Sequence, residues 1–246
     1  TRLTKVTGVQ TCALPIFYAK HVRCYLCKEP YNRVFWPIIG KGSIELRKGS
    51  VKMLMTGDQY IESLRKLKTR VYMFGEQVEN WVDNPIIRPS INSVAATYDL
   101  AQDPQYKDLM TAKSNLTGET VNRFAHLHQS PEDLKKKVKM QRLLGQKTAS
   151  CFQRCVGMDA FNAVYSTTFE TDKKFGTSYH KNFVNYLKFV QENDLVVDGA
   201  MTDPKGDRGL MPSKQRDKDL FLRIVEKRDD GIVVRGSKAH QTGSIN

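Results

Sequence analysis

The order of two sequence patterns constrains this chain's fold more than any other feature. Helical periodicity comes first and short β-rich runs come last. Apolar residues recur at helical spacing through most of residues 57–193, and the longest helical region covers about residues 135–171. Three later runs are short and rich in β-formers, at 195–197, 220–225 and 232–235, with a turn signal at 229–231. A helical region followed by antiparallel strands predicts an α+β fold.

Capping patterns predict where several helices begin. A hydroxyl residue followed by a glutamine, a proline or acidic residues can satisfy the free N–H groups of a first helical turn. Thr56 and Ser130 fit this description, and Ser90, which follows a loop bracketed by Pro85 and Pro89, can also cap a helix. An apolar stripe predicts a further helix over residues 179–193, and the run 71–74, which ends at a glycine, predicts a strand or a turn.

Composition is ordinary for a globular chain, but the positive charge is concentrated at one end. The 246 residues are 40% hydrophobic and 26% charged, with a formal net charge of +13. Residues 1–52 hold ten lysines and arginines and two glutamates, so the remaining residues are only mildly basic. This distribution argues against nucleic acid as a partner. Because no apolar run reaches the length of a membrane span and no signal peptide is visible, we expect no membrane partner and a cytoplasmic location.

Residues 1–52 also differ from the rest of the chain in pattern. They show no sustained helical or strand period, and residues 6–16 resemble the in-frame translation of a sequencing-library adapter. We therefore predict that residues 1–52 are non-native adapter and upstream sequence with little stable structure, and that the protein's own chain begins at Met53. Cys24 and Cys27 form a CxxC pair in this segment, but no second pair lies at zinc spacing, so chance explains it better than a metal site.

Cys151 and Cys155 are the residues that point most directly to chemistry. They lie in the run 146–161, which contains no proline and predicts one continuous helix. Side chains four residues apart project from the same face of a helix. Two thiolates on one face can hold part of a zinc or iron–sulfur site, although a buried packing pair of cysteines fits the pattern equally well.

Two polar stretches near the end of the chain are suited to a cofactor. Residues 201–208 form a loop punctuated by glycine and proline, whose hydroxyl, N–H and basic groups suit a phosphate or the edge of a flavin. Residues 240–244 follow a predicted strand and contain a glycine, which lets a backbone approach a flat ring closely. A surface linker and an ordinary turn explain the two stretches equally well when each is taken alone.

Three segments together resemble one family. Residues 141–155, 201–209 and 240–246 are similar to the dehydratase branch of the 4-hydroxyphenylacetate 3-hydroxylase superfamily, whose members have an acyl-CoA dehydrogenase-like fold. The resemblance implies an N-terminal α-helical domain over residues 53–194 and the start of an antiparallel β middle domain over residues 195–246. It also implies that the chain is a fragment without activity of its own, because that family has further ligands and helices beyond this point.

The resemblance also implies cofactors and partners. These are FAD, a 4Fe–4S cluster with two further ligands missing from this chain, a CoA-thioester substrate and a homotetramer. Cys151 and Cys155 match the first two cluster ligands, and Gln153 and Thr242 match active-site positions. The implied flavin-binding residues are Met201, Thr202, Asp203, Pro204, Lys205, Gly206, Asp207, Arg208, His240, Gln241 and Thr242.

The implied reaction removes water from 4-hydroxybutyryl-CoA to give crotonyl-CoA, with isomerisation of vinylacetyl-CoA as a second activity. The proton must leave C3, which the thioester does not acidify, so a simple base is insufficient near neutral pH. Reversible one-electron transfer by a flavin and a Lewis-acidic iron supply what a base lacks, and Gln153 and Thr242 are expected to tune the two cofactors. The alternative is a flavin-dependent aromatic hydroxylase of the same superfamily, which would leave the cysteine pair without a role.

Overall fold

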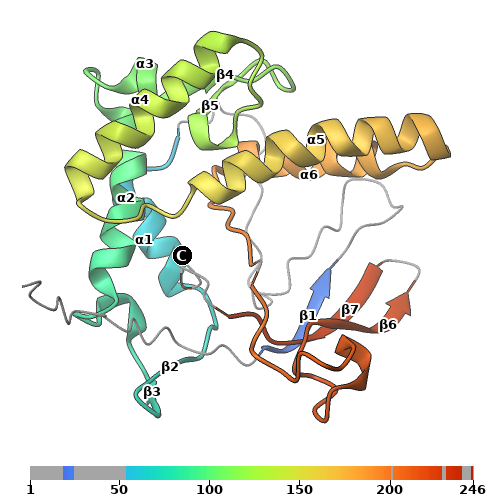
Figure 1. Cartoon of the computed structure of the whole chain (residues 1–246). Coiled ribbons are helices and arrows are strands. Elements are labelled where there is room, and N and C mark those ends of the chain that lie inside the picture. Colours follow the sequence, from blue (N-terminus) through green and yellow to red (C-terminus); the bar gives the residue numbers. More distant parts are fainter. Residues whose placement is uncertain (1–18, 25–53, 201, 229–230, 240–244, 246) are drawn as a thin grey trace, which may run out of the picture.

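The computed structural model describes residues 19–24, 54–200, 202–228, 231–239 and 245. The helices gather on one side of this part of the chain, and a three-stranded sheet lies to the other side (Figure 1). The helices are α1 (Gly57–Arg65), α2 (Arg88–Gln102), α3 (Lys107–Met110), α4 (Pro131–Thr148), α5 (Cys155–Phe175) and α6 (Tyr179–Asn193), with 3-10 turns η1 (Trp81–Asp83), η2 (Arg123–Ala125) and η3 (Pro212–Lys214). The strands are β1 (Ala19–Cys24), β2 (Val71–Met73), β3 (Glu76–Val78), β4 (Thr111–Lys113), β5 (Thr120–Asn122), β6 (Arg223–Arg228) and β7 (Gly231–Gly236).

The strands pair antiparallel in three small sheets. β2 pairs with β3 and β4 with β5, while the larger sheet has the order β1–β7–β6. Helices combined with small antiparallel sheets confirm the predicted α+β class. No helix in the described ranges is long and apolar enough to cross a bilayer.

β1 lies in the segment where the sequence predicts little stable structure. Residues 19–24 pair with residues 232–236 of β7. An edge strand can be held by backbone hydrogen bonds alone, so it requires no alternation of apolar side chains that a sequence pattern would reveal. The rest of residues 1–52 lies outside the described residues.

Two of the predicted helix starts are confirmed. At α1, the Thr56 hydroxyl accepts a hydrogen bond from Gln59 N (3.2 Å) and Gln59 Oε1 accepts one from Thr56 N (3.0 Å), which completes a capping box. At α4, the Ser130 hydroxyl accepts a hydrogen bond from Asp133 N (3.3 Å).

The predicted start at Ser90 is wrong. α2 begins two residues earlier, at Arg88, and Pro89 lies in its first turn. Proline fits that position because the first N–H groups of a helix have no partner within the helix. Ser90 therefore lies inside α2, where its hydroxyl accepts a hydrogen bond from the Gln153 side chain (2.8 Å).

The predicted continuous helix over residues 146–161 is also wrong. Thr148 ends α4, and α5 does not begin until Cys155. The hydroxyl of Thr148 accepts a hydrogen bond from Ser150 N (3.3 Å), and such local bonds offer the backbone an alternative to the helix. Cys151 consequently lies in the connecting loop, and the two cysteines do not share a helix face.

The predicted β-rich runs meet different outcomes. Residues 232–235 lie within β7, and residues 220–225 overlap the start of β6. Residues 195–197 form no strand, because this segment packs against α5 and pairs with no other strand in the described part. Residues 229–230 of the predicted turn lie outside the described residues. The run 71–74 forms β2 and its turn, as predicted.

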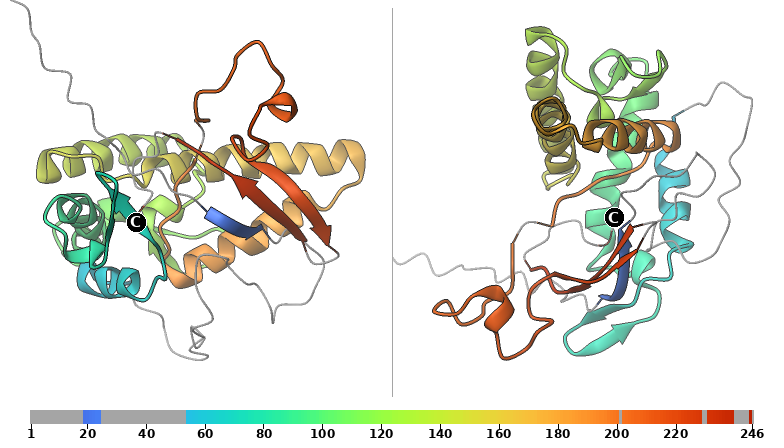
Figure 2. Two further views of the ribbon diagram at one scale, coloured as in Figure 1. Left: turned by 90° about the horizontal axis from the view of Figure 1, so that it is seen from below. Right: turned by 90° about the vertical axis from the view of Figure 1, so that its right-hand side faces the viewer.

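The core of the helical region consists of three packed clusters. The first joins α1 to α2, the second lies between α2, α3 and α4, and the third lies between α5 and α6. The predicted stripe on residues 179–193 is buried in the third cluster, where Phe183, Leu187 and Val190 pack against Phe161 of α5. α5 and α6 accordingly run side by side as a helical pair (Figure 2).

Candidate cofactor site

Residues 149–154 connect α4 to α5, and together with Cys155, the first residue of α5, we call them the cysteine loop. Cys151 is exposed in this loop, Cys155 is partly buried at the start of α5, and both thiols are free. Gln153, between them, is buried and has a φ of 63°. A left-handed conformation costs a residue other than glycine about 1–2 kcal/mol and persists where surrounding contacts determine it.

Two side chains of the cysteine loop hold it against the helices. Gln153 Nε2 donates a hydrogen bond to the Ser90 hydroxyl of α2 (2.8 Å). Arg154 is only 2% exposed and points into the core, where Nη1 donates to Thr97 Oγ1 (2.9 Å) and Nη2 to Leu195 O (3.4 Å). The sequence does not reveal this role of Arg154, because arginine is rarely buried and nothing in the pattern marks this one as internal.

The charge of Arg154 is balanced inside the protein. Its Nη2 lies 3.7 Å from Asp194 Oδ1, and its guanidinium lies over the rings of Tyr98 (4.5 Å) and Phe124 (5.0 Å). Asp194 is itself fixed, since its other oxygen accepts a hydrogen bond from Met55 N (3.0 Å) and its carbonyl accepts one from the Tyr98 hydroxyl (2.8 Å). A buried ion pair with this many partners is costly to disrupt on one side only.

The thiols provide soft donors, but they do not form a complete metal site in the described residues. Burial raises the pKa of the Cys155 thiol, and negative charge on Cys151 raises it further, so a bound metal would have to displace the proton. No group of three or more His, Cys, Asp or Glu residues in the described part could hold a metal ion. Two exposed or partly exposed thiols on one short loop therefore fit half of a four-ligand iron–sulfur or zinc site.

The segment 195–200 runs from α6 toward residues 201–208, which we call the flavin loop after its predicted role, and crosses the first turn of α5. A Cβ placed on Gly157 would lie 2.1 Å from Val197 O, and a Cβ on Gly199 would lie 2.7 Å from Val156 Cγ1. Glycine at position 157 is what permits this close approach. The crossing brings the segment that precedes residue 201 next to the helix turn that begins with Cys155.

The first predicted flavin-binding stretch pairs with residues 238–239, which precede the second stretch. Ala239 N donates a hydrogen bond to Thr202 O (2.8 Å), and Lys238 Nζ lies 2.7 Å from Asp203 Oδ1. Ala239 is the residue that directly precedes the second stretch in the sequence. The predicted residues that lie outside the described part are Met201, His240, Gln241 and Thr242.

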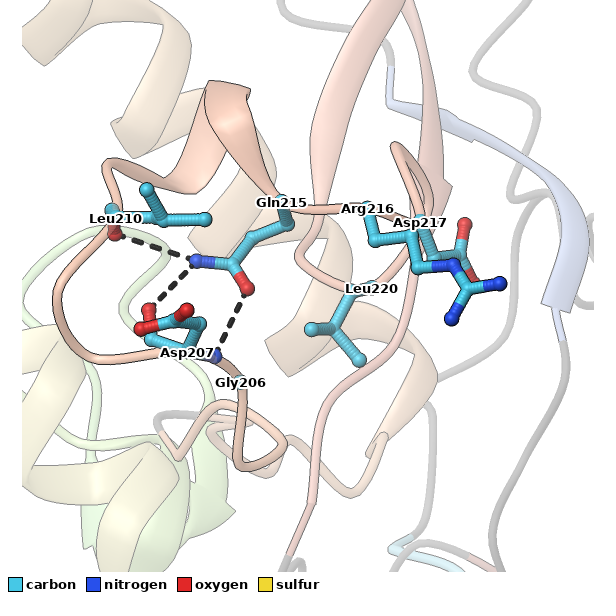
Figure 3. A pocket seen from close by; sticks show the side chains of 7 residues that line it. All are labelled: Gly206, Asp207, Leu210, Gln215, Arg216, Asp217 and Leu220. Carbon is cyan, nitrogen blue, oxygen red and sulfur yellow. Dashed lines mark hydrogen bonds between the residues drawn. The ribbon is translucent and has the colours of Figure 1, made fainter.

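The loop over residues 206–220 folds around one buried glutamine, Gln215, which no pattern in the sequence marks as internal. Gln215 Oε1 accepts a hydrogen bond from Asp207 N (3.0 Å), and Gln215 Nε2 donates to Asp207 O (2.8 Å) and Leu210 O (3.2 Å) (Figure 3). An open cavity of about 580 Å³ lies beside these contacts. It is lined by Gly206, Asp207, Leu210, Gln215, Arg216, Asp217 and Leu220.

Most of the predicted flavin residues that the structure describes are exposed to solvent, namely Thr202, Asp203, Lys205, Asp207 and Arg208. Pro204 and Gly206 are partly covered.

His126 and His180 both pack against neighbouring side chains of the helical region. His126 is buried with its Nε2 3.3 Å from Asp133 Oδ1, and burial lowers the pKa of His126. His180 on α6 packs edge-on against Tyr165 with ring centroids 4.6 Å apart. These contacts indicate structural roles for both histidines.

Comparison with known proteins identifies the family. The family model described as 4-hydroxyphenylacetate 3-hydroxylase N terminal matches residues 56–246. The chain belongs to the 4-hydroxyphenylacetate 3-hydroxylase N-terminal family. The matched range includes both the cysteine loop and the described part of the flavin loop, and it confirms the predicted resemblance.

Individual family members differ in how similar they are to this chain. This chain is 81% identical over 194 residues to 4-hydroxybutyryl-CoA dehydratase/vinylacetyl-CoA-Δ-isomerase of Clostridium aminobutyricum. The alignment covers 79% of this chain and 40% of that protein. The structure of an oxygen-tolerant archaeal 4-hydroxybutyryl-CoA dehydratase from N. maritimus matches with a TM-score of 0.73 and 57% identity, over 78% of this chain and 38% of that one.

The oxygenase component of 4-hydroxyphenylacetate 3-monooxygenase is a more distant member of the family. The protein from Thermus thermophilus is 30% identical over 190 residues, which covers 77% of this chain and 38% of that protein. A structure of such a component complexed with FAD matches with a TM-score of 0.59 and 29% identity, over 75% of this chain and 38% of that one. The chain therefore spans about 40% of the length of the relatives it matches.

Proposed function

We propose that this chain belongs to a dehydratase that converts 4-hydroxybutyryl-CoA to crotonyl-CoA and also isomerises vinylacetyl-CoA. The observation that carries the proposal is the 81% identity over 194 residues to the Clostridium protein of that name. The 30% identity to a monooxygenase component is far lower. The cysteine pair, which a flavin-dependent aromatic hydroxylase would not use, supports the same choice.

In this proposal, residues 53–194 form an N-terminal α-helical domain and residues 195–246 begin an antiparallel β domain of an acyl-CoA dehydrogenase-like fold. The distribution of elements supports this division, because all six helices of the described part lie before residue 195 and β6 and β7 lie after it. The complete enzyme is proposed to assemble as a homotetramer and to take a CoA thioester as substrate.

Cys151 and Cys155 are proposed to provide two thiolates to a 4Fe–4S cluster. Their accessibility supports this role, since one thiol is exposed and the other partly so, and both lie on a short, anchored loop. Two more ligands must come from outside the described residues. Gln153 is proposed to act mainly through its left-handed turn, which sets the positions of the two cysteines relative to each other.

Residues 201–208 and 240–242 are proposed to bind FAD. The backbone pairing of Ala239 with Thr202 supports a shared site, and the exposed Lys205 and Arg208 are suited to the pyrophosphate. When bound, the flavin supplies reversible one-electron transfer and the cluster supplies a Lewis-acidic iron for the departing hydroxyl. Thr242 is proposed to donate a hydrogen bond to the flavin ring.

A full-length hybrid tests this proposal. In the hybrid, the matching 194 residues of this chain replace the corresponding part of the Clostridium protein. Purified without oxygen, it is expected to contain FAD, iron and sulfide and to form crotonyl-CoA from 4-hydroxybutyryl-CoA. A folded hybrid that contains flavin but no iron, and that hydroxylates a phenol with reduced flavin and oxygen, would establish the aromatic hydroxylase instead.

A further inference from the structure

We propose that Arg154 is a positioning residue that fixes the cysteine loop and the segment leading to the flavin loop in one arrangement. The identity of the two cofactors rests on the proposed function, whereas the contacts of Arg154 are seen in the structure itself. Arg154 is not a ligand or a reacting group in this proposal, because its side chain points into the core and away from solvent.

Arg154 is connected both to the cysteine loop, through its backbone, and to the segment 195–200, through its buried guanidinium. Its backbone lies between Gln153 and Cys155, so its position determines where α5 begins. Its guanidinium contacts Asp194, the last residue before the segment 195–200, and donates to Leu195 O within that segment. One side chain therefore links the start of Cys155's helix to the start of the segment that reaches the flavin loop.

The far end of this connection is also rigid. Asp194 has a φ of 46° and is held by hydrogen bonds from Met55 N and the Tyr98 hydroxyl. From there the chain crosses α5 at Gly157 and continues to Thr202, which pairs with Ala239. A displacement of the guanidinium would consequently move both the loop that carries the thiols and the segment that leads to the proposed flavin site.

The geometry requires arginine and is not satisfied by a positive charge alone. The planar fork reaches Thr97 and Leu195 from two different nitrogens, and its face stacks on Tyr98 at 4.5 Å. A lysine has one flexible ammonium and cannot make these contacts together. The variant Arg154→Lys therefore keeps the charge that Asp194 needs and removes the positioning.

Two variants separate positioning from general stability. Arg123 is equally buried and donates to Leu109 O (2.7 Å), but its hydrogen bonds reach neither loop of the site, so Arg123→Lys controls for loss of a buried arginine. Ser90→Ala removes the Gln153 contact and leaves the contacts of Arg154 with Asp194 and Leu195 intact. It is therefore expected to loosen the cysteine loop alone.

The first test uses the 246-residue chain and needs no cofactor. The rates at which a maleimide modifies Cys151 and Cys155 are measured by mass spectrometry in folded protein. Arg154→Lys is expected to accelerate modification of the partly buried Cys155 relative to Cys151, and Arg123→Lys is expected to leave the ratio unchanged. An unchanged ratio in Arg154→Lys, or an equal change in both variants, overturns the proposal.

The second test uses the full-length hybrid and measures iron retention against a chelator and the dissociation constant of FAD. Arg154→Lys is expected to weaken both iron retention and FAD binding. The loss of iron retention should be about 10- to 100-fold, because losing a group that orients metal ligands typically has an effect of this size. Ser90→Ala is expected to weaken iron retention only. An Arg154→Lys hybrid that retains FAD as wild type does refutes the link between the two parts.

The two tests distinguish this proposal from the proposed function. If the wild-type hybrid contains no iron, the dehydratase proposal fails while the maleimide ratio still decides the role of Arg154. If Arg154→Lys does not fold, the pair Arg154→Met with Asp194→Asn removes the charge on both sides and is measured in its place. A maleimide ratio equal to wild type in that double variant also overturns the proposal.

Discussion

Replacing Gly157 by alanine tests the crossing of residues 195–200 over α5. An alanine inside a helix ordinarily adds about 0.5–1 kcal/mol of stability relative to glycine. Here the new Cβ would lie 2.1 Å from Val197 O and 2.8 Å from Val197 C. Backbone atoms cannot rotate away as the end of a side chain can, so the segment must retreat, and overpacking of this kind costs roughly 1–3 kcal/mol. We expect a net loss of about 1–2 kcal/mol.

Urea unfolding of the 246-residue chain, followed by circular dichroism of the helices, measures this loss. With a typical dependence on urea of about 2 kcal/mol per molar, the midpoint of Gly157→Ala should fall by roughly 0.5–1 M. Gly145→Ala in α4 is the matched control, because nothing lies within 4 Å of a Cβ placed there. It should raise the stability by about 0.5–1 kcal/mol.

The opposite signs of the two glycine variants are the decisive feature. If Gly157→Ala stabilises the chain as Gly145→Ala does, the segment 195–200 does not lie on the first turn of α5. The proposed proximity of the cysteine loop to the segment that leads to the flavin loop would then lose its structural support.

Three further predictions concern local structure. Thr56→Ala removes half of the capping box of α1 and should lower the free energy of unfolding by about 0.5–2 kcal/mol, whereas Thr56→Ser should restore most of it. Because burial lowers the pKa of His126 below its usual 6.5, the unfolded chain binds that proton first. Stability should therefore decline as the pH falls below about 6.5, and urea titrations of His126→Gln should show a smaller decline. Gln215→Ala removes the hydrogen bonds to Asp207 and Leu210, so limited proteolysis should cut residues 206–220 faster without unfolding the helices.

Those features that depend on local pattern could be predicted from the sequence. The capping box at Thr56, the start at Ser130 and the helix over residues 179–193 follow from residues within a few positions of one another. The strand over residues 232–235 follows in the same way. These predictions hold because local propensity and tertiary packing favour the same structure there.

Features that depend on distant contacts could not be predicted. The break between α4 and α5 is set by Thr148 hydrogen bonds and by burial of Arg154 against Asp194, forty residues further along the chain. A pattern of cysteines four apart carries no information about that burial. The same limit applies to β1, whose partner β7 lies at the other end of the described part.

The roles predicted for the candidate site residues stay predictions, and the structure bears only on how the described ones are arranged. Cys151 is exposed and Cys155 partly exposed, and Thr202 of the first predicted flavin stretch pairs with Ala239, the residue before the second. Their mutual geometry was wrong, because the cysteines flank a left-handed turn at Gln153 and do not lie on one helix. The residues that hold this turn, Arg154 and Ser90, carry no local signal of their role.

The dependence of crotonyl-CoA formation on the cysteine pair is the most direct measurement of the proposed chemistry. The full-length hybrid and its Cys151→Ser and Cys155→Ser variants are assayed with 4-hydroxybutyryl-CoA under anaerobic conditions. We predict that the wild-type hybrid forms crotonyl-CoA and that each serine variant loses both iron and this activity while it remains folded. Formation of crotonyl-CoA at the wild-type rate by either serine variant would contradict the assignment of these thiols to the cluster.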